Sequence, residues 1–129
     1  MHSNRLVFAL ALAATLAPVV PAWAGTYSSP LITVPAGGLG RCTVSNVGTA
    51  PINLTGTLYD NAGSVKAPLG SECVDVYAGV LPAGVTCIIV VGPGPVRCVI
   101  NASSSKVRAV LVVTNAANDI TASEPATKK

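Results

Sequence analysis

The stretch Arg41–Asp60 reads RCTVSNVGTAPINLTGTLYD and contains two runs with the pattern of a β-strand. Apolar and polar residues alternate in each run, which places the apolar side chains on one face. Between the runs, Asn46–Pro51 holds the Asn, Gly and Pro residues typical of a turn. We therefore expect a strand over 41–46, a turn, and a second strand over 52–59, each with one buried face.

The remainder of the chain repeats this pattern, with clusters of Pro, Gly, Asn and Asp about every ten residues. Pro and Gly recur too often to leave room for a helix. We expect a polar lead-in at Thr26–Pro30 and further strands over Leu31–Val34, Ser64–Lys66, Cys73–Val80, Thr86–Val91, Val96–Asn101 and Val107–Thr114, with a short one at Ile120. The spacing favours an all-β sandwich or barrel of seven to nine short antiparallel strands.

The first 24 residues have the features of a secretory signal peptide. Arg5 precedes an apolar run, Leu6–Val20, and an Ala-x-Ala sequence ends just before Gly25. Pro18 interrupts the run, which is shorter than the about 20 apolar residues of a membrane-spanning helix. We therefore expect three parts, namely a signal peptide over 1–24, a β-sandwich domain over 25–120 and a flexible polar tail over 121–129. The mature protein is expected to be secreted or periplasmic, without a membrane span.

The four cysteines favour two disulfides, because their number is even and the chain is short and exported. A zinc site would need C-x-x-C spacing or a histidine, and neither is present after residue 24. Cys42 and Cys98 lie on the apolar faces of well-patterned strands, whereas Cys73 and Cys87 flank a turn at Leu81–Gly84. We expect the pairs Cys42–Cys98 and Cys73–Cys87. The alternative pairs Cys87 with Cys98 and Cys42 with Cys73.

Parts of the sequence resemble a known class of domains. The run Thr43–Asp60, TVSNVGTAPINLTGTLYD, resembles the immunoglobulin-like and adhesion-related β-sandwich domains of bacterial secreted proteins. The segments LPAGVTC, at Leu81–Cys87, and VRCVI, at Val96–Ile100, are similar to small secreted bacterial sandwich proteins of unassigned function. The resemblance implies an immunoglobulin-like sandwich, in which a Cys42–Cys98 bond would join strands B and F. It implies no catalytic residue.

Composition narrows the possible functions. Charged residues make up 10% of the chain and the net charge is +3, so no nucleic-acid footprint is visible. Residues 25–129 contain no histidine, and disulfide formation would consume the cysteines, which removes the usual bases and nucleophiles. We expect no enzyme activity, no catalytic residue, no cofactor and no metal.

Three carboxylates of the chain are candidates for a catalytic or calcium-binding site. Asp60 is expected to stabilise its turn, as Asp commonly does. Glu72 and Asp75 flank Cys73 and are a weak candidate for a paired-carboxylate site. A calcium site at Asp60 and Asn61 would need more oxygen ligands than this segment offers.

Several polar and aromatic residues are candidates for a binding surface. Tyrosines commonly anchor interfaces, and the chain has Tyr27, Tyr59 and Tyr77. Arg97 and Arg108 point outward from late strands and could form a basic stripe, although a solvated surface is the favoured explanation. Asn53-Leu54-Thr55 and Asn101-Ala102-Ser103 match the sequon for N-glycosylation, which chance alone produces in a chain rich in Ser and Thr.

Three functions are consistent with these features. The first is a non-catalytic binding or structural module that contacts an unknown protein or surface ligand. The second is a subunit of an extracellular polymer or surface assembly that uses exposed strand edges, since the apolar run Val107–Val113 favours self-association. The third is a small secreted inhibitor or hydrolase. The oligomeric state distinguishes the first from the second.

A tryptic digest without reduction tests the disulfide pairing. Trypsin releases three cysteine peptides, Cys42–Lys66, Ala67–Arg97 and Cys98–Lys106, and the middle one holds both Cys73 and Cys87. The expected mass spectrum shows the first peptide joined only to the third. Either other pairing would tie all three peptides into one species.

Overall fold

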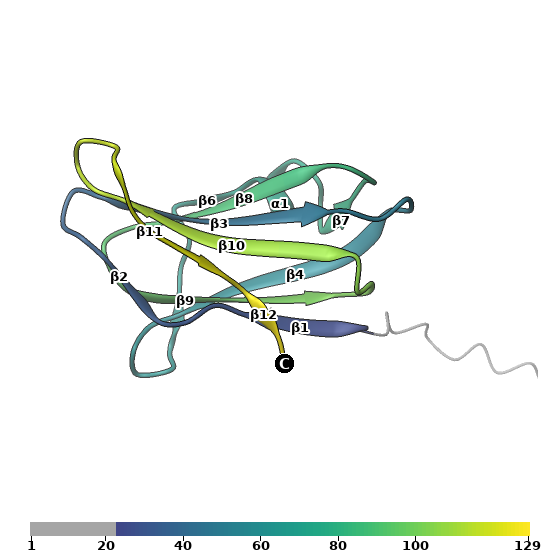
Figure 1. Cartoon of the computed structure of the whole chain (residues 1–129), viewed down its shortest axis with the longest axis horizontal. Helices are drawn as coiled ribbons and strands as arrows, with labels where there is room; N and C mark the ends of the chain where they lie inside the picture. Colours follow the sequence, from purple (N-terminus) through teal and green to yellow (C-terminus); the bar gives the residue numbers. More distant parts are fainter. Residues whose placement is uncertain (1–22) are drawn as a thin grey trace, which may run out of the picture.

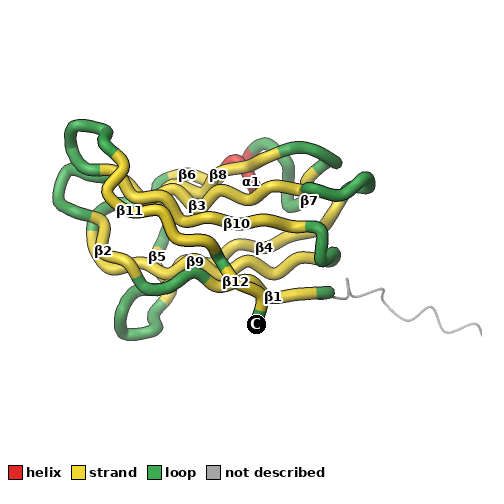
Figure 2. Tube along the Cα trace, viewed as in Figure 1, coloured by secondary structure: helices red, strands yellow, loops and turns green. Residues whose placement is uncertain are grey.

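The computed structural model describes residues 23–129, so the predicted signal peptide lies outside the described residues except for Trp23 and Ala24. The described chain forms two antiparallel β-sheets that pack face to face (Figures 1 and 2). Its one helix, α1 (Glu72–Asp75), is a single turn. Within residues 23–129 no helix is long and apolar enough to cross a membrane.

Seven strands form the larger sheet. Its main path runs through β12 (Thr127–Lys128), β1 (Gly25–Ser28), β9 (Gly94–Ala102), β4 (Ile52–Tyr59) and β5 (Val65–Lys66). In addition, β2 (Ile32–Val34) pairs with β9, and β7 (Val80–Leu81) pairs with β4. The smaller sheet has the order β11 (Ile120–Pro125), β10 (Val107–Thr114), β3 (Leu39–Asn46), β8 (Thr86–Val91) and β6 (Gly70–Ser71). Every pairing is antiparallel, so the predicted all-β class is confirmed.

The core lies between the sheets and follows the predicted alternation. In β3 every second residue is buried, and β9 and β10 alternate in the same way. Branched aliphatic side chains dominate this core, and Tyr27 is the one aromatic residue among its buried members. Such side chains suit the pleated surface of a sheet, but they leave the core small.

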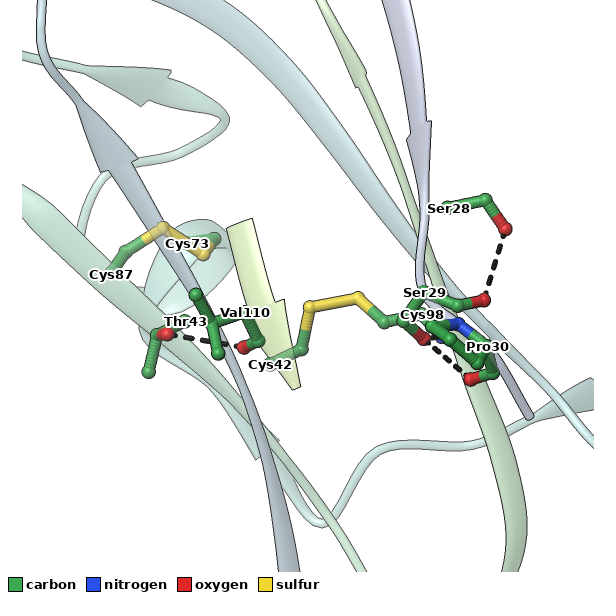
Figure 3. Close-up of a disulfide and its surroundings, with 9 residues drawn as sticks. All are labelled: Ser28, Ser29, Pro30, Cys42, Thr43, Cys73, Cys87, Cys98 and Val110. Carbon is green, nitrogen blue, oxygen red and sulfur yellow. Dashed lines mark hydrogen bonds between the residues drawn. A yellow bond between two sulfur atoms is a disulfide. The ribbon is translucent and has the colours of Figure 1, made fainter. Parts of the chain in front are cut away.

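Two disulfides reinforce this core. Cys42 on β3 and Cys98 on β9 join the two sheets across the interior, with a Cα–Cα distance of 6.3 Å (Figure 3). Both residues are fully buried. Cys73 on α1 is joined to Cys87 on β8, with a Cα–Cα distance of 5.1 Å. These are the two pairs that the sequence predicts.

The two strands of the 41–60 stretch form where predicted, but they are not neighbours. β3 lies in the five-stranded sheet and β4 in the seven-stranded sheet. Each strand has other partners on both sides: β10 and β8 flank β3, whereas β9 lies on one side of β4 and the short strands β5 and β7 on the other. The turn therefore carries the chain from one sheet to the other.

Asn46 holds this crossing in place. Its side chain is buried, yet every polar atom is used: Nδ2 donates to the carbonyls of Ala50 (2.8 Å) and Leu81 (3.0 Å), and Oδ1 accepts from Gly48 N–H (3.0 Å). Its backbone also bonds to Val85 and Gly84. One amide thus connects the end of β3 to its turn and to β7.

The predicted strand over Cys73–Val80 is wrong. This segment begins as α1, with Val76 N–H donating to the Glu72 carbonyl at 3.0 Å. It then reverses at Ala78 and Gly79, whose φ angles are 51° and 77°. The alternation of Val74 and Val76 with polar residues suggested a strand with a buried face, but these valines are 64% and 66% exposed and do not face the core. Cys73 consequently reaches Cys87 from a helical turn, not from a hairpin strand.

Both ends of the described chain are more ordered than expected. The predicted lead-in at Thr26–Pro30 contains β1, which pairs with β9, and the predicted flexible tail over 121–129 contains most of β11 and all of β12. We call residues 120–129 the C-terminal strap, because β11 pairs with β10 in one sheet and β12 with β1 in the other (Figure 1). With β1, β12 and the short strands β6 (Gly70–Ser71) and β7 (Val80–Leu81), the described chain has twelve strands instead of the expected seven to nine, and four of the twelve are two residues long.

Replacing Asn46 with alanine should cost about 3 kcal/mol of unfolding free energy, because two carbonyls and one N–H would lose their partners in a buried position. Asn115→Ala is the matched control. Asn115 also accepts two backbone N–H bonds, from Ala117 and Asp119, but at an exposed turn, so its loss should cost about 1 kcal/mol. Denaturant unfolding measures both values, and equal losses would contradict the role given to Asn46.

Candidate binding surface

Arg97 stands at the centre of the candidate binding surface. It lies on β9 next to Cys98, and because side chains alternate along a strand, Cys98 points into the core while Arg97 points outward. Arg97 is paired in register with Tyr59 of β4, and its guanidinium lies over the Tyr59 ring, 5.5 Å from the centroid. Such a contact between a cation and an aromatic face restrains the arginine without using its N–H donors.

Two hollows meet at Arg97. The larger, of about 490 Å³, lies between the β1–β2 connection and the C-terminal strap, and the smaller, of about 270 Å³, lies against the turn after β4. Arg97 and Leu31 line both hollows. We call the two hollows together the Arg97 surface; its other charged or amide side chains are Asp60, Asn61, Glu124 and Lys129.

Asp60 builds the wall of the smaller hollow. Its Oδ1 accepts from the N–H groups of Ala62 and Ser64, both at 2.9 Å, and its own N–H donates to the Ser64 carbonyl at 2.9 Å. This confirms the prediction that Asp60 stabilises its turn. Since these bonds use one carboxylate oxygen, Asp60 can still present the other to a ligand.

Buried serines build the wall of the larger hollow. Ser29 accepts at Oγ from Cys98 N–H (3.0 Å) and donates its own N–H to the Cys98 carbonyl (2.9 Å), so it is fixed to the strand that carries Arg97 (Figure 3). The Ser28 hydroxyl is satisfied by the Ser29 carbonyl at 3.3 Å. The opposite wall is the C-terminal strap. Its backbone is held by two hydrogen bonds: Ala126 N–H donates to the Ala109 carbonyl (2.8 Å), and Lys129 N–H donates to the Thr26 carbonyl (2.9 Å).

The other candidate residues do not join this surface. Tyr27 is buried and donates its hydroxyl to the Ser105 carbonyl at 3.2 Å, and Tyr77 packs partly buried after α1. Arg108 lies on β10, in the opposite sheet from Arg97, so the two arginines do not form the basic stripe considered as an alternative to a solvated surface. Of the three tyrosines, Tyr59 alone contributes, as the support for Arg97.

The carboxylates beside Cys73 line none of the three hollows of the described chain. Glu72 and Asp75 are exposed on α1, and within residues 23–129 no group of three His, Cys, Asp or Glu side chains could hold a metal ion. The two sequons lie on adjacent strands, where Thr55 pairs with Asn101. The Asn53 side chain is exposed, whereas Asn101 accepts a hydrogen bond from the Thr26 hydroxyl at 2.7 Å.

A third, apolar hollow lies at the far edge of the sandwich. It measures about 350 Å³ and lies between β4, β8 and α1, where Leu54, Gly56, Val74 and Ile89 line it. Gly56 faces inward, since a side chain there would meet Ile89 and Ile100, yet the hollow leaves this glycine exposed. No ionisable side chain lines this hollow.

Half of the Arg97 surface was missed by sequence reasoning. Ser29, Glu124 and Lys129 lie in segments that were expected to be a lead-in and a tail, and no local pattern marks them. Asp60 and Arg97 were both recognised, but their proximity follows from the β4–β9 register. Comparisons with protein-family models, curated proteins and solved structures find no match.

Two substitutions at Asp60 separate its structural role from any role in binding. Asp60→Ala should lower the unfolding free energy by about 1 kcal/mol, because two N–H groups lose their acceptor. Asp60→Asn keeps an oxygen acceptor at the same place, so the unfolding free energy should change by less than about 0.5 kcal/mol. Urea denaturation of both variants is the measurement, and a loss in Asp60→Asn as large as in Asp60→Ala would refute the assignment.

Proposed function

We propose that this protein is a non-catalytic, secreted or periplasmic binding module with an immunoglobulin-like sandwich. The observation that carries the proposal is the Arg97 surface, in which two hollows meet at an outward-pointing arginine on a rigid frame. The inter-sheet bond between β3 and β9 supports the immunoglobulin-like assignment, because strands B and F are joined in this way in antibody domains.

The disulfides support an exported setting. On the chain-entropy model the long Cys42–Cys98 loop contributes about 4 kcal/mol and the short Cys73–Cys87 loop about 3 kcal/mol. These contributions are comparable to the whole stability of a small domain, which is about 5–15 kcal/mol. A fold that depends on its disulfides to this extent needs an oxidising compartment.

The edges of the sheets support a single module over a polymer subunit. In the described chain six strands pair with a single neighbour; of these, β5, β6, β7 and β12 are only two residues long and β2 is three residues long. The sixth, β11, carries Glu124 and ends at Pro125. Short strands, charges and proline at an edge discourage the addition of a neighbouring strand.

Two measurements on the exported protein test this function. Size-exclusion chromatography with light scattering should find a monomer, and mass spectrometry of the material recovered outside the cytoplasm should find a chain that begins at Gly25. Filaments or large oligomers would favour the polymer subunit instead. Retention in the cytoplasm with free thiols would refute the exported setting.

The C-terminal strap provides a prediction about association. A chain truncated after Asp119 lacks β11 and β12, so the edge of β10, with its apolar run Val107–Val113, becomes free to pair with another molecule. We expect this variant to form dimers or aggregates. A chain truncated after Pro125 loses only β12 and should stay monomeric. Light scattering at equal concentrations compares the two, and a monomeric Asp119 truncation would contradict the protective role of β11.

A further inference from the structure

We propose that the Arg97 surface binds a neutral, hydroxyl-rich glycan that spans both hollows and therefore contains at least two sugar units. This inference rests on the proposed binding function and specifies its ligand. It follows from the charge balance of the surface, from the mixture of polar and apolar groups on its walls, and from the position of Arg97 between the two hollows.

The charges of the surface balance. Arg97 and Lys129 supply two positive side chains, and Asp60 and Glu124 supply two negative ones, with one carboxylate in each hollow. An anion in either hollow would be attracted by the guanidinium of Arg97 and repelled by the carboxylate that lines the same hollow. A cation would meet the opposite pattern. Charge complementarity therefore favours a neutral ligand.

The polar groups match hydroxyls. Arg97 offers N–H donors that its contact with Tyr59 leaves open, Glu124 and the second oxygen of Asp60 offer acceptors, and Asn61 offers both. A sugar hydroxyl both donates and accepts, so it can bond to either kind of group. Hydrogen bonds that involve a charged partner are also stronger than neutral ones.

Apolar groups complete the walls. Leu31 is 50% exposed and lines both hollows, while Pro30 and Pro125 line the larger one. The C–H faces of sugar rings can pack on such side chains, as in ligand sites where a few polar groups are set in an apolar wall. The larger hollow, at about 490 Å³, falls in the usual range for small-ligand pockets, and the smaller, at about 270 Å³, extends it past Arg97.

A peptide strand fits this surface less well. Strand addition needs free backbone N–H and carbonyl groups along an edge. At the smaller hollow the backbone of the turn is already bonded within itself, through Asp60, Gly63 and Ser64. At the larger hollow two edge strands are neighbours: β12 has only two residues, and β11 ends there at Pro125, which has no N–H to donate. Recognition here must therefore rely on side chains, which suits a glycan.

Binding of the full mature protein to a microarray of neutral and acidic glycans, followed by calorimetry with the best neutral oligosaccharide, tests the proposal. We expect neutral glycans to bind. Arg97→Met, which keeps the aliphatic stem but removes the donors, should weaken binding about 10- to 100-fold. Arg108→Met, at an exposed arginine of the opposite sheet, is the matched control and should bind within about twofold of the natural protein.

A second variant guards against misfolding of Arg97→Met. The Glu124 side chain is exposed on β11 and makes no hydrogen bond within residues 23–129, so Glu124→Gln should fold normally and weaken glycan binding by about fivefold. Circular dichroism and thermal unfolding confirm the fold of each variant before binding is compared.

Three results would overturn the proposal. They are no binding of any neutral glycan at about 1 mM, a strong preference for acidic glycans or peptides, and equal binding by the Arg97→Met and Arg108→Met variants. The proposed function can fail separately, because it depends on the monomeric and exported state. A monomer from the exported fraction that binds no glycan would refute only the ligand class.

Discussion

The bond between Cys42 and Cys98 is the constraint on which the structure depends. It joins the central strand of one sheet to a central strand of the other, and it lies in a core made almost entirely of Val, Ile, Leu and Ala. Without large aromatic side chains such a core buries little surface per residue. Covalent linkage offsets that deficit by restricting the unfolded chain.

The same bond supports the candidate binding surface. Cys98 and Arg97 are adjacent on β9. Because neighbouring side chains on a strand point to opposite faces, the disulfide holds Cys98 in the core while Arg97 points outward. Ser29 bonds to both backbone groups of Cys98, and the connection it belongs to forms one wall of the larger hollow. The surface is therefore preorganised, which lowers the entropic cost of binding.

Much of the fold could be predicted because it depends on local chemistry. Alternation placed β3, β4, β8 and β10 within two residues of their observed bounds. The even number of cysteines, two on inward faces and two beside a turn, indicated both disulfides. Asp60 was recognised as a turn residue because its hydrogen bonds span only four residues. The same reasoning failed at α1, where Val74 and Val76 alternate without facing the core.

By itself, the sequence determined the long strands β3, β4, β8 and β10 and the turns beside them, since these follow from a period of two and from turn-forming residues. It also favoured the observed cysteine pairs, from two inward-facing thiols and from two thiols beside a turn. The tertiary structure alone decided that β3 and β4 belong to different sheets, that the strap closes one side of the sandwich, and that Arg97 stands apart from Arg108. These features depend on backbone pairing between distant segments. A polar strand such as β11 carries no side-chain signal of its partner, because backbone hydrogen bonds, not burial, hold it in place.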